Sequence, residues 1–148
     1  MKLDLKSGKI RKIFVIGQGT AAVAAKAVEI AISTQLTGIA IIVKAKPATE
    51  LSAFDLVSDM SDTLVVAISQ SGTTTDTNRT VQLVRDRGAK VIAIVNRRNS
   101  DLADRADGVL YTSDGRDIEM SVASTKAFYS QVVAGHLLAF AMSEVVSA

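Results

Sequence analysis

The sequence contains no cysteine and only one histidine, and both scarcities exclude chemistry. A chain without cysteine forms no disulfide and offers no thiolate, either as nucleophile or as metal ligand, and it suits a reducing compartment. The one histidine, His136, lies among apolar neighbours with no second metal ligand nearby in the sequence. We therefore expect no metal site, and we interpret His136 as a core or interface residue rather than a catalytic one.

An excess of charge of one sign is also missing, because 17 basic residues are matched by 15 acidic ones. This balance gives no reason to expect nucleic acid or an anionic membrane surface as a partner. No apolar run reaches the roughly 18 residues of a membrane span. The polar beginning of the chain lacks the apolar core of a signal peptide. We expect one cytoplasmic domain, long enough at 148 residues to bury a full core.

Five apolar runs predict five strands, and segments with helical spacing lie between and after them. The runs are continuous rather than alternating, as in strands that are buried on both faces. The expected strands are residues 12–16, 39–43, 63–68, 90–95 and 108–111, and the expected helices are residues 21–35, 49–58, 75–87, 100–105 and 121–143. Pro47 marks the start of the second helix, and Gly88 stands where a glycine would end the third. Repeated strand–helix units predict an α/β fold, a three-layer α/β/α sandwich of flavodoxin type with a five-stranded parallel sheet in the order 2-1-3-4-5.

The loop after the third expected strand is the most informative segment of the chain. It carries a hydroxyl at nearly every position, on Ser69, Ser71, Thr73, Thr74, Thr75 and Thr77. A strand-to-helix loop directs backbone N–H groups and the positive end of the helix dipole at one point, and Gly72 lets a ligand approach the backbone closely. Because the loop contains no lysine or arginine, it predicts a phosphate held by neutral donors. The simpler interpretation is that the hydroxyls only cap the helix, although capping needs one hydroxyl.

The predicted strand order also indicates a ligand site beside the hydroxyl-rich loop. Sheets of this order bind ligands beyond the carboxyl ends of the strands, between the first and the third. The loop after the first strand, Gly17-Gln-Gly-Thr20, therefore lies beside the hydroxyl-rich loop. Its two glycines match the start of a dinucleotide fingerprint, but position 22 is alanine and no acidic residue ends the second strand. An ordinary nucleotide-binding domain is therefore a weaker alternative, and we expect no cofactor.

The last expected helix is apolar on nearly all sides between Val132 and Met142. The whole chain is 48% hydrophobic with a mean hydropathy of +0.28, so much apolar surface has to be covered. A helix of this kind is buried on more than one side. We expect it to pair with another domain of the same kind, in a homodimer or within one polypeptide. The alternative is that the first helix of the chain covers the remaining face.

Two motifs, Ser69-Gln-Ser-Gly-Thr-Thr-Thr-Asp-Thr77 and Val122-Ala-Ser-Thr-Lys-Ala-Phe128, resemble those of the sugar isomerase (SIS) domain family. The resemblance extends from about residue 13 to residue 140, and more narrowly the chain is similar to the first of the two SIS domains in glutamine–fructose-6-phosphate aminotransferases. It implies substrate-binding roles for Thr20, Ser69, Gln70, Ser71, Thr74, Val122 and Ser124. The first loop departs from the family at Gln18 and Ala21, and the second departs at Thr73, where the family has glutamate.

The resemblance implies a function in sugar-phosphate binding. The ligand would be of the fructose 6-phosphate or glucosamine 6-phosphate type, and the chain would be the isomerase-side domain of an aminotransferase-like protein. The alternative is a non-catalytic phosphosugar sensor. In the aminotransferases the ring-opening and proton-transfer groups belong to the second SIS domain and the C-terminal tail. We therefore expect residues 1–148 to be a single SIS domain of a longer polypeptide, which binds the sugar without converting it. Lys126 is open to three interpretations: a Schiff-base nucleophile, an ion-pair partner, or a residue that orients a loop.

Overall fold

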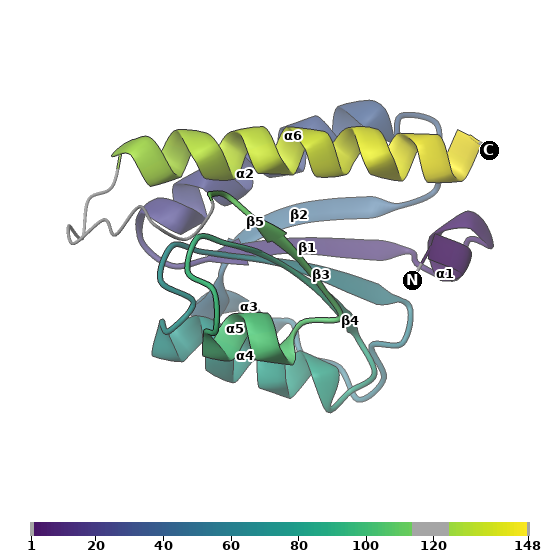
Figure 1. Ribbon diagram of the computed structural model, residues 1–148. Coiled ribbons are helices and arrows are strands. Elements are labelled where there is room, and N and C mark those ends of the chain that lie inside the picture. Colours follow the sequence, from purple (N-terminus) through teal and green to yellow (C-terminus); the bar gives the residue numbers. More distant parts are fainter. Residues whose placement is uncertain (1, 114–124, 148) are drawn as a thin grey trace.

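The computed structural model describes residues 2–113 and 125–147, which form a five-stranded sheet between two layers of helices (Figure 1). All neighbouring strands are parallel, in the order β2-β1-β3-β4-β5. The strands are β1 (Lys12–Gly17), β2 (Ile42–Pro47), β3 (Thr63–Ser69), β4 (Lys90–Val95) and β5 (Gly108–Tyr111). The predicted sandwich and its strand order are confirmed.

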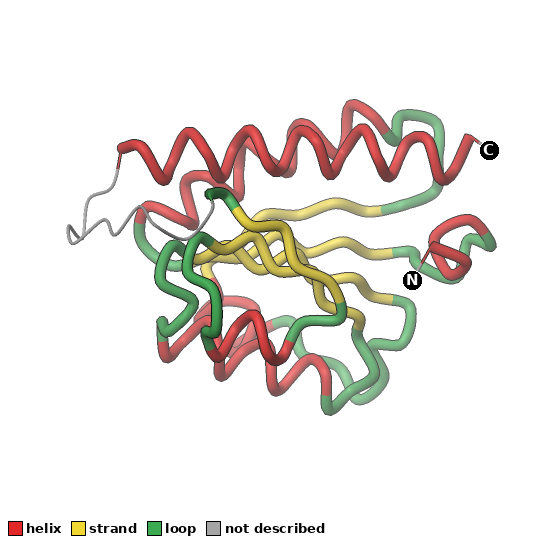
Figure 2. Tube along the Cα trace, viewed as in Figure 1, coloured by secondary structure: helices red, strands yellow, loops and turns green. Residues whose placement is uncertain are grey.

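The helices divide between the two faces of the sheet (Figure 2). They are α1 (Lys2–Lys6), α2 (Thr20–Gln35), α3 (Ala48–Phe54), α4 (Thr75–Arg85), α5 (Asp101–Arg105) and α6 (Thr125–Ser147). Helices α2 and α6 cover one face, and α3, α4 and α5 cover the other. None of the helices in the described ranges is both long enough and apolar enough to cross a membrane.

Two apolar cores lie on the two sides of the sheet, and β3 is buried along its whole length between them. The first core joins α2 and α6 to the sheet. The two helices pack so closely that a Cβ on Gly135 of α6 would lie 2.2 Å from a methyl carbon of Val28 on α2. The second core places Leu51, Val81 and Leu102, from α3, α4 and α5, against the other face.

The second strand was predicted in the wrong place. Residues 39–43 were expected, but the strand runs from Ile42 to Pro47. The apolar residues just before it belong to the turn that follows α2, where the Ile39 N–H donates to the Leu36 carbonyl at 3.0 Å. Ile39 packs against the first core from this turn. Because β2 is an edge strand that exposes Ile42 and Lys44, it lacks the continuous apolar pattern that marked the other strands.

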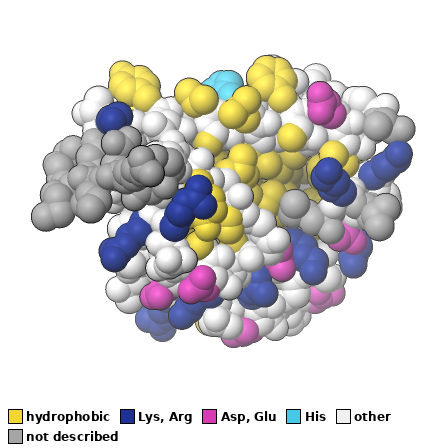
Figure 3. All heavy atoms as spheres, viewed as in Figure 1, with side chains coloured by type: hydrophobic (Ala, Val, Ile, Leu, Met, Phe, Trp, Pro, Cys, Tyr) yellow, Lys and Arg dark blue, Asp and Glu magenta, His cyan; other side chains and the backbone are white. Residues whose placement is uncertain are grey.

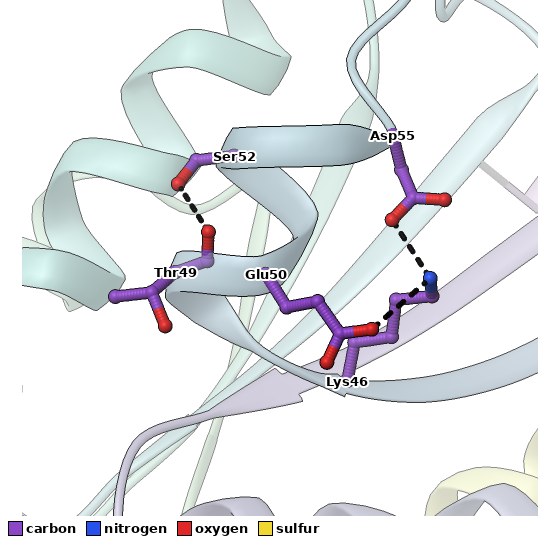
Figure 4. A network of polar contacts seen from close by, with 5 residues as sticks. All are labelled: Lys46, Thr49, Glu50, Ser52 and Asp55. Atoms are coloured by element: carbon purple, nitrogen blue, oxygen red, sulfur yellow. Dashed lines mark hydrogen bonds and ion pairs between the residues drawn. The ribbon is translucent and has the colours of Figure 1, made fainter.

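The start of the second helix was predicted correctly, but its end was not. Pro47 occupies the position before α3, and the helix ends at Phe54 rather than at residue 58. An ion-pair network fixes this segment (Figure 4). The Lys46 ammonium lies 2.8 Å from an Asp55 carboxylate oxygen and 3.5 Å from one of Glu50. The hydrogen bond to Asp55, with the charges of both carboxylates, holds the pKa of Lys46 above its ordinary value.

Gly88 lies in the turn that ends α4, as the sequence predicted, although the helix ends at Arg85 and not at residue 87. This glycine has φ +91°, and its N–H donates to the Arg85 carbonyl at 2.9 Å. The Ala89 N–H donates to the Val84 carbonyl at 3.1 Å, so the two bonds form a Schellman motif with Gly88 as its left-handed residue. Helix α1 was not expected, because a five-residue helix carries too little periodic pattern to be recognised.

Candidate functional site

The loops that follow β1 and β3 lie side by side at the carboxyl edge of the sheet. The register pairs Ile16 with Ala67, so the two strands end next to each other. From β1 the chain continues into α2 on one face, and from β3 it continues into α4 on the other (Figure 1). The edge between them is where the strand order reverses, and the N-termini of both helices lie there.

Ser69 closes the β3–α4 loop (residues 70–74) from inside. Its side chain is buried, and its hydroxyl oxygen accepts the Gly72 N–H at 3.0 Å. The same oxygen lies 3.5 Å from the Thr74 hydroxyl. Ser69 therefore sets the curvature of the loop, while the half-exposed Ser71 and Thr74 line its surface.

Ser71 is held with its proton available for donation. Its hydroxyl oxygen accepts both the backbone N–H of Thr73, at 3.2 Å, and the hydroxyl of Thr73, at 3.0 Å. A hydroxyl has two acceptor lone pairs and one proton, so these two bonds use its accepting capacity. What remains is the O–H, which can only donate. Ser71 thus presents a donor at the half-exposed surface of the loop.

A contact within the protein requires glycine at position 72. It has φ +68°, and a Cβ there would lie 2.2 Å from the Ser100 hydroxyl oxygen. Its carbonyl accepts the Asn78 side-chain amide at 3.0 Å and the Leu102 N–H at 3.1 Å. From the sequence, this glycine is expected to let a ligand approach the backbone closely. In the structure that space is filled by the β4–α5 loop (residues 96–100) and its Ser100.

The N-terminus of α4 is not capped by the residue that precedes it. Thr74 occupies the N-cap position, and its hydroxyl makes no capping hydrogen bond. Thr75 and Asp76, in the first turn, are exposed. The simpler interpretation of the loop, in which hydroxyls serve only to cap the helix, therefore finds no support at Thr74. The first N–H groups of α4 point toward the same edge as the Ser71 donor.

The sequence did not predict that the β4–α5 loop contacts the β3–α4 loop. The Gln70 carbonyl accepts the backbone N–H groups of Asn96 and Arg97, both at 3.3 Å. This contact places an exposed arginine beside a loop that has no cation of its own. The predicted strand order already made β3 and β4 neighbours, so adjacency of their following loops was the available signal.

The β1–α2 loop (residues 18–19) is more open. A Cβ on Gly17 would lie 2.6 Å from the Ala21 carbonyl carbon, so the strand can turn into α2 only with glycine there. Gly19 has φ +59°, and Thr20 is exposed at the first turn of α2. The Gln18 amide donates to the Thr49 hydroxyl at 3.4 Å, which links this loop to α3.

The fold brings five of the seven predicted site residues to one edge: Thr20, Ser69, Gln70, Ser71 and Thr74. Val122 and Ser124 lie outside the described residues, and so does the predicted start of the last helix at residue 121. His136 is exposed on α6, with Nδ1 2.9 Å from the Val132 carbonyl oxygen, so it does not lie in the core. Within the described ranges, no three histidine or acidic side chains gather as a metal site would require.

Comparison with known proteins gives the same fold and family. The profile of the SIS domain matches residues 8–141. The chain belongs to the SIS domain family. It is 41% identical over 143 residues to the glutamine–fructose-6-phosphate aminotransferase of Mycobacterium bovis, a match that covers 95% of this chain and 22% of the relative. The chain therefore spans about a fifth of the length of that curated relative.

Solved structures of this SIS fold extend the comparison. The C-terminal domain of glucosamine-fructose-6-phosphate aminotransferase from Francisella tularensis superposes with a TM-score of 0.83 at 28% identity, covering 97% of this chain and 39% of that one. The Vibrio vulnificus NanR protein, complexed with ManNAc-6P, superposes with a TM-score of 0.70 over 97% of this chain and 51% of that one. Its 19% identity supports a shared fold only.

Proposed function

We propose that this SIS domain binds a sugar phosphate of the fructose 6-phosphate or glucosamine 6-phosphate type, with the phosphate in the β3–α4 loop. The observation that carries the proposal is the Ser71 hydroxyl, which is left as a donor by its two accepted bonds. It stands where the N-terminus of α4 directs a positive dipole end and backbone N–H groups. Donors of this kind bind an anion without a paired lysine or arginine in the loop.

The bound phosphate would position the rest of the sugar. Binding energy from a remote group can fix the orientation of the reacting carbons, because a bound phosphate restricts where C1 and C2 lie. Thr20 and Gln70 stand at the same edge and would contact the sugar. The groups that act on C1 and C2 would come from another SIS domain, as part of an aminotransferase-like protein of which residues 1–148 are one domain. The 41% identity to such an aminotransferase supports this assignment.

A thermal-shift screen tests the proposal, since a ligand that binds only the native state raises the unfolding temperature. Fructose 6-phosphate and glucosamine 6-phosphate should stabilise the chain. Unphosphorylated fructose at the same concentration should have no effect. The Ser71→Ala variant should lose most of the shift while keeping the unfolding temperature of the free protein. Equal shifts with fructose and its 6-phosphate would overturn the proposal.

A regulatory role is the second candidate, favoured by the likeness of the fold to a NanR protein complexed with ManNAc-6P. In that role the domain would bind an amino-sugar phosphate and report it to a partner. Tight binding of an N-acetylated amino-sugar phosphate, with weak binding of fructose 6-phosphate, would favour the sensor. The reverse preference would favour the aminotransferase-like role.

A further inference from the structure

The β4–α5 loop carries two consecutive arginines at the carboxyl edge of the sheet, and their surroundings differ. The guanidinium carbon of Arg98 lies 4.4 Å from the centroid of the Tyr111 ring, close enough for a cation to be attracted to the aromatic face. Arg97 is exposed, and within residues 2–113 and 125–147 it forms no ion pair. The charge of Arg97 is therefore available to a ligand.

The backbone of Arg97 is fixed against the β3–α4 loop on both sides. Its N–H donates to the Gln70 carbonyl at 3.3 Å, and its own carbonyl accepts the Ser100 hydroxyl at 3.1 Å. Ser100 in turn fills the space beside Gly72. Gln70 directly precedes Ser71, and consecutive Cα atoms are only about 3.8 Å apart. A long cationic side chain is thus attached at a set position next to the Ser71 donor.

Positive charge is what the β3–α4 loop itself lacks, because the Ser71 hydroxyl and the first N–H groups of α4 are neutral donors. The strand order β1-β3-β4 places Arg97 on one side of this loop and the β1–α2 loop on the other. Figure 3 shows basic side chains at the left of the molecule, the end at which the strands finish in Figure 1. A cation here adjoins the phosphate end of a ligand whose sugar lies toward the β1–α2 loop.

We infer that Arg97 binds the phosphate and makes the site select a doubly charged anion. The inference rests on the proposed function, because it adds a residue to the same site. A guanidinium can donate two parallel N–H groups to two oxygens of one phosphate, and its attraction to the anion grows with the charge of the anion. At about pH 8 a sugar phosphate is largely a dianion, whereas a sugar sulfate of the same shape carries a single charge. The site would therefore prefer the phosphate.

Calorimetric titration of the 148-residue chain with fructose 6-phosphate tests the role of Arg97. Arg97→Gln should raise Kd roughly 5–10-fold, the loss expected for a partly solvated bond to a charged group. Arg97→Lys keeps the charge without the planar pair of donors, so it should recover part of the affinity. Arg11→Gln is the matched control, because it removes the same charge from an exposed residue at the opposite edge of the sheet, and its Kd should equal that of the parent.

Salt and the sulfate ester provide two further measurements. Raising the ionic strength from about 0.01 M to about 0.15 M should weaken the parent more than Arg97→Gln, because screening reduces the attraction to a cation. The preference of the parent for fructose 6-phosphate over fructose 6-sulfate should shrink in Arg97→Gln.

The outcomes separate this inference from the proposed function. A parent chain that does not bind fructose 6-phosphate would overturn both. Binding by the parent that is unchanged in Arg97→Gln would overturn the role of Arg97 alone, and so would equal losses in Arg97→Gln and Arg11→Gln, since those would reflect net charge. An unchanged preference for phosphate over sulfate in Arg97→Gln would contradict the selection of a doubly charged anion.

Discussion

The two loops at the carboxyl edge of the sheet are neighbours, yet they are built in opposite ways. The β3–α4 loop is held by its own hydroxyls, with Ser69 bonded to the Gly72 N–H and Ser71 bonded twice to Thr73. The β1–α2 loop has no comparable internal bonds among its described residues, and it turns on glycine. We propose that the two loops have different roles, in which the β3–α4 loop holds the phosphate in a preformed geometry and the β1–α2 loop borders the sugar.

The largest expected difference between the two loops is in the loss of unfolding free energy when the positive-φ glycine of each loop is replaced by alanine. Gly72→Ala combines backbone strain with a Cβ 2.2 Å from the Ser100 hydroxyl, whereas Gly19→Ala meets no atom within 4 Å. Strain alone costs about 1–3 kcal/mol. Crowding in a packed site adds about 1–3 kcal/mol. Urea denaturation should therefore show a larger loss of unfolding free energy for Gly72→Ala than for Gly19→Ala.

A second substitution, Ser100→Gly, separates the cost of backbone strain from the cost of crowding. It should restore part of the lost unfolding free energy in the Gly72→Ala protein and none in the Gly19→Ala protein. Equal recovery in both would show that the contact between Ser100 and Gly72 is not what distinguishes the two loops.

Ser71→Ala should give the next largest effect, on affinity rather than on stability. Loss of one hydrogen bond to a charged group weakens binding by about 1–2 kcal/mol, or roughly 5–30-fold in Kd. Because Ser71 is half exposed, its removal should change the unfolding free energy little. Calorimetric titration with fructose 6-phosphate measures the change. An unaltered Kd would remove Ser71 from the site.

Thr73→Val tests whether the Ser71 donor is held in place by its neighbour. The substitution removes the hydroxyl that donates to Ser71 and keeps the backbone N–H that also does. We expect a loss of about 0.5–1 kcal/mol in binding, the net value of one neutral hydrogen bond. Thr73→Ser restores the hydroxyl and should restore the affinity for inorganic phosphate. If Val and Ser at this position bind equally well, Thr73 does not position Ser71.

Thr20→Val examines the other loop and carries the smallest expected effect. Thr20 is exposed at the start of α2, so its hydroxyl should contact the sugar and not the phosphate. The variant should bind fructose 6-phosphate a few-fold more weakly. Its affinity for inorganic phosphate should match that of the parent. An equal loss of affinity for both ligands would mean that the two loops form one phosphate site.

How far the sequence predicts this molecule depends on where each residue lies in the sheet. Strand β3 is buried along its length and gave a continuous apolar run, so it was placed correctly. Strand β2 is at the edge and exposes Ile42, so the preceding apolar turn was mistaken for its start. Strand β5 is also at the edge, but its residues 108–111 are apolar and no apolar turn precedes them, so it was placed correctly as well.

In the candidate site, too, features that are local in the sequence were predictable, and features that depend on tertiary contacts were not. The hydroxyl-rich loop was recognisable because its donors are consecutive in sequence. The contact of Gly72 with Ser100 was not, because it depends on how two loops from neighbouring strands meet. The hydrogen bonds from Thr73 to Ser71 could not be predicted from the sequence for a different reason. Several hydroxyls are close enough to bond, and the sequence does not say which one accepts.

Nuclear magnetic resonance of the 15.6 kDa chain tests the location of the ligand most directly. Fructose 6-phosphate added to ¹⁵N-labelled protein should shift the amide signals of residues 71–76 saturably, because the phosphate would lie against this loop and the first turn of α4. The amides of Arg11, Asp62 and Gly88, at the opposite edge of the sheet, should stay in place, and fructose alone should shift neither set. Saturable shifts that leave residues 71–76 unchanged, or equal shifts with unphosphorylated fructose, would contradict a phosphate site in the β3–α4 loop.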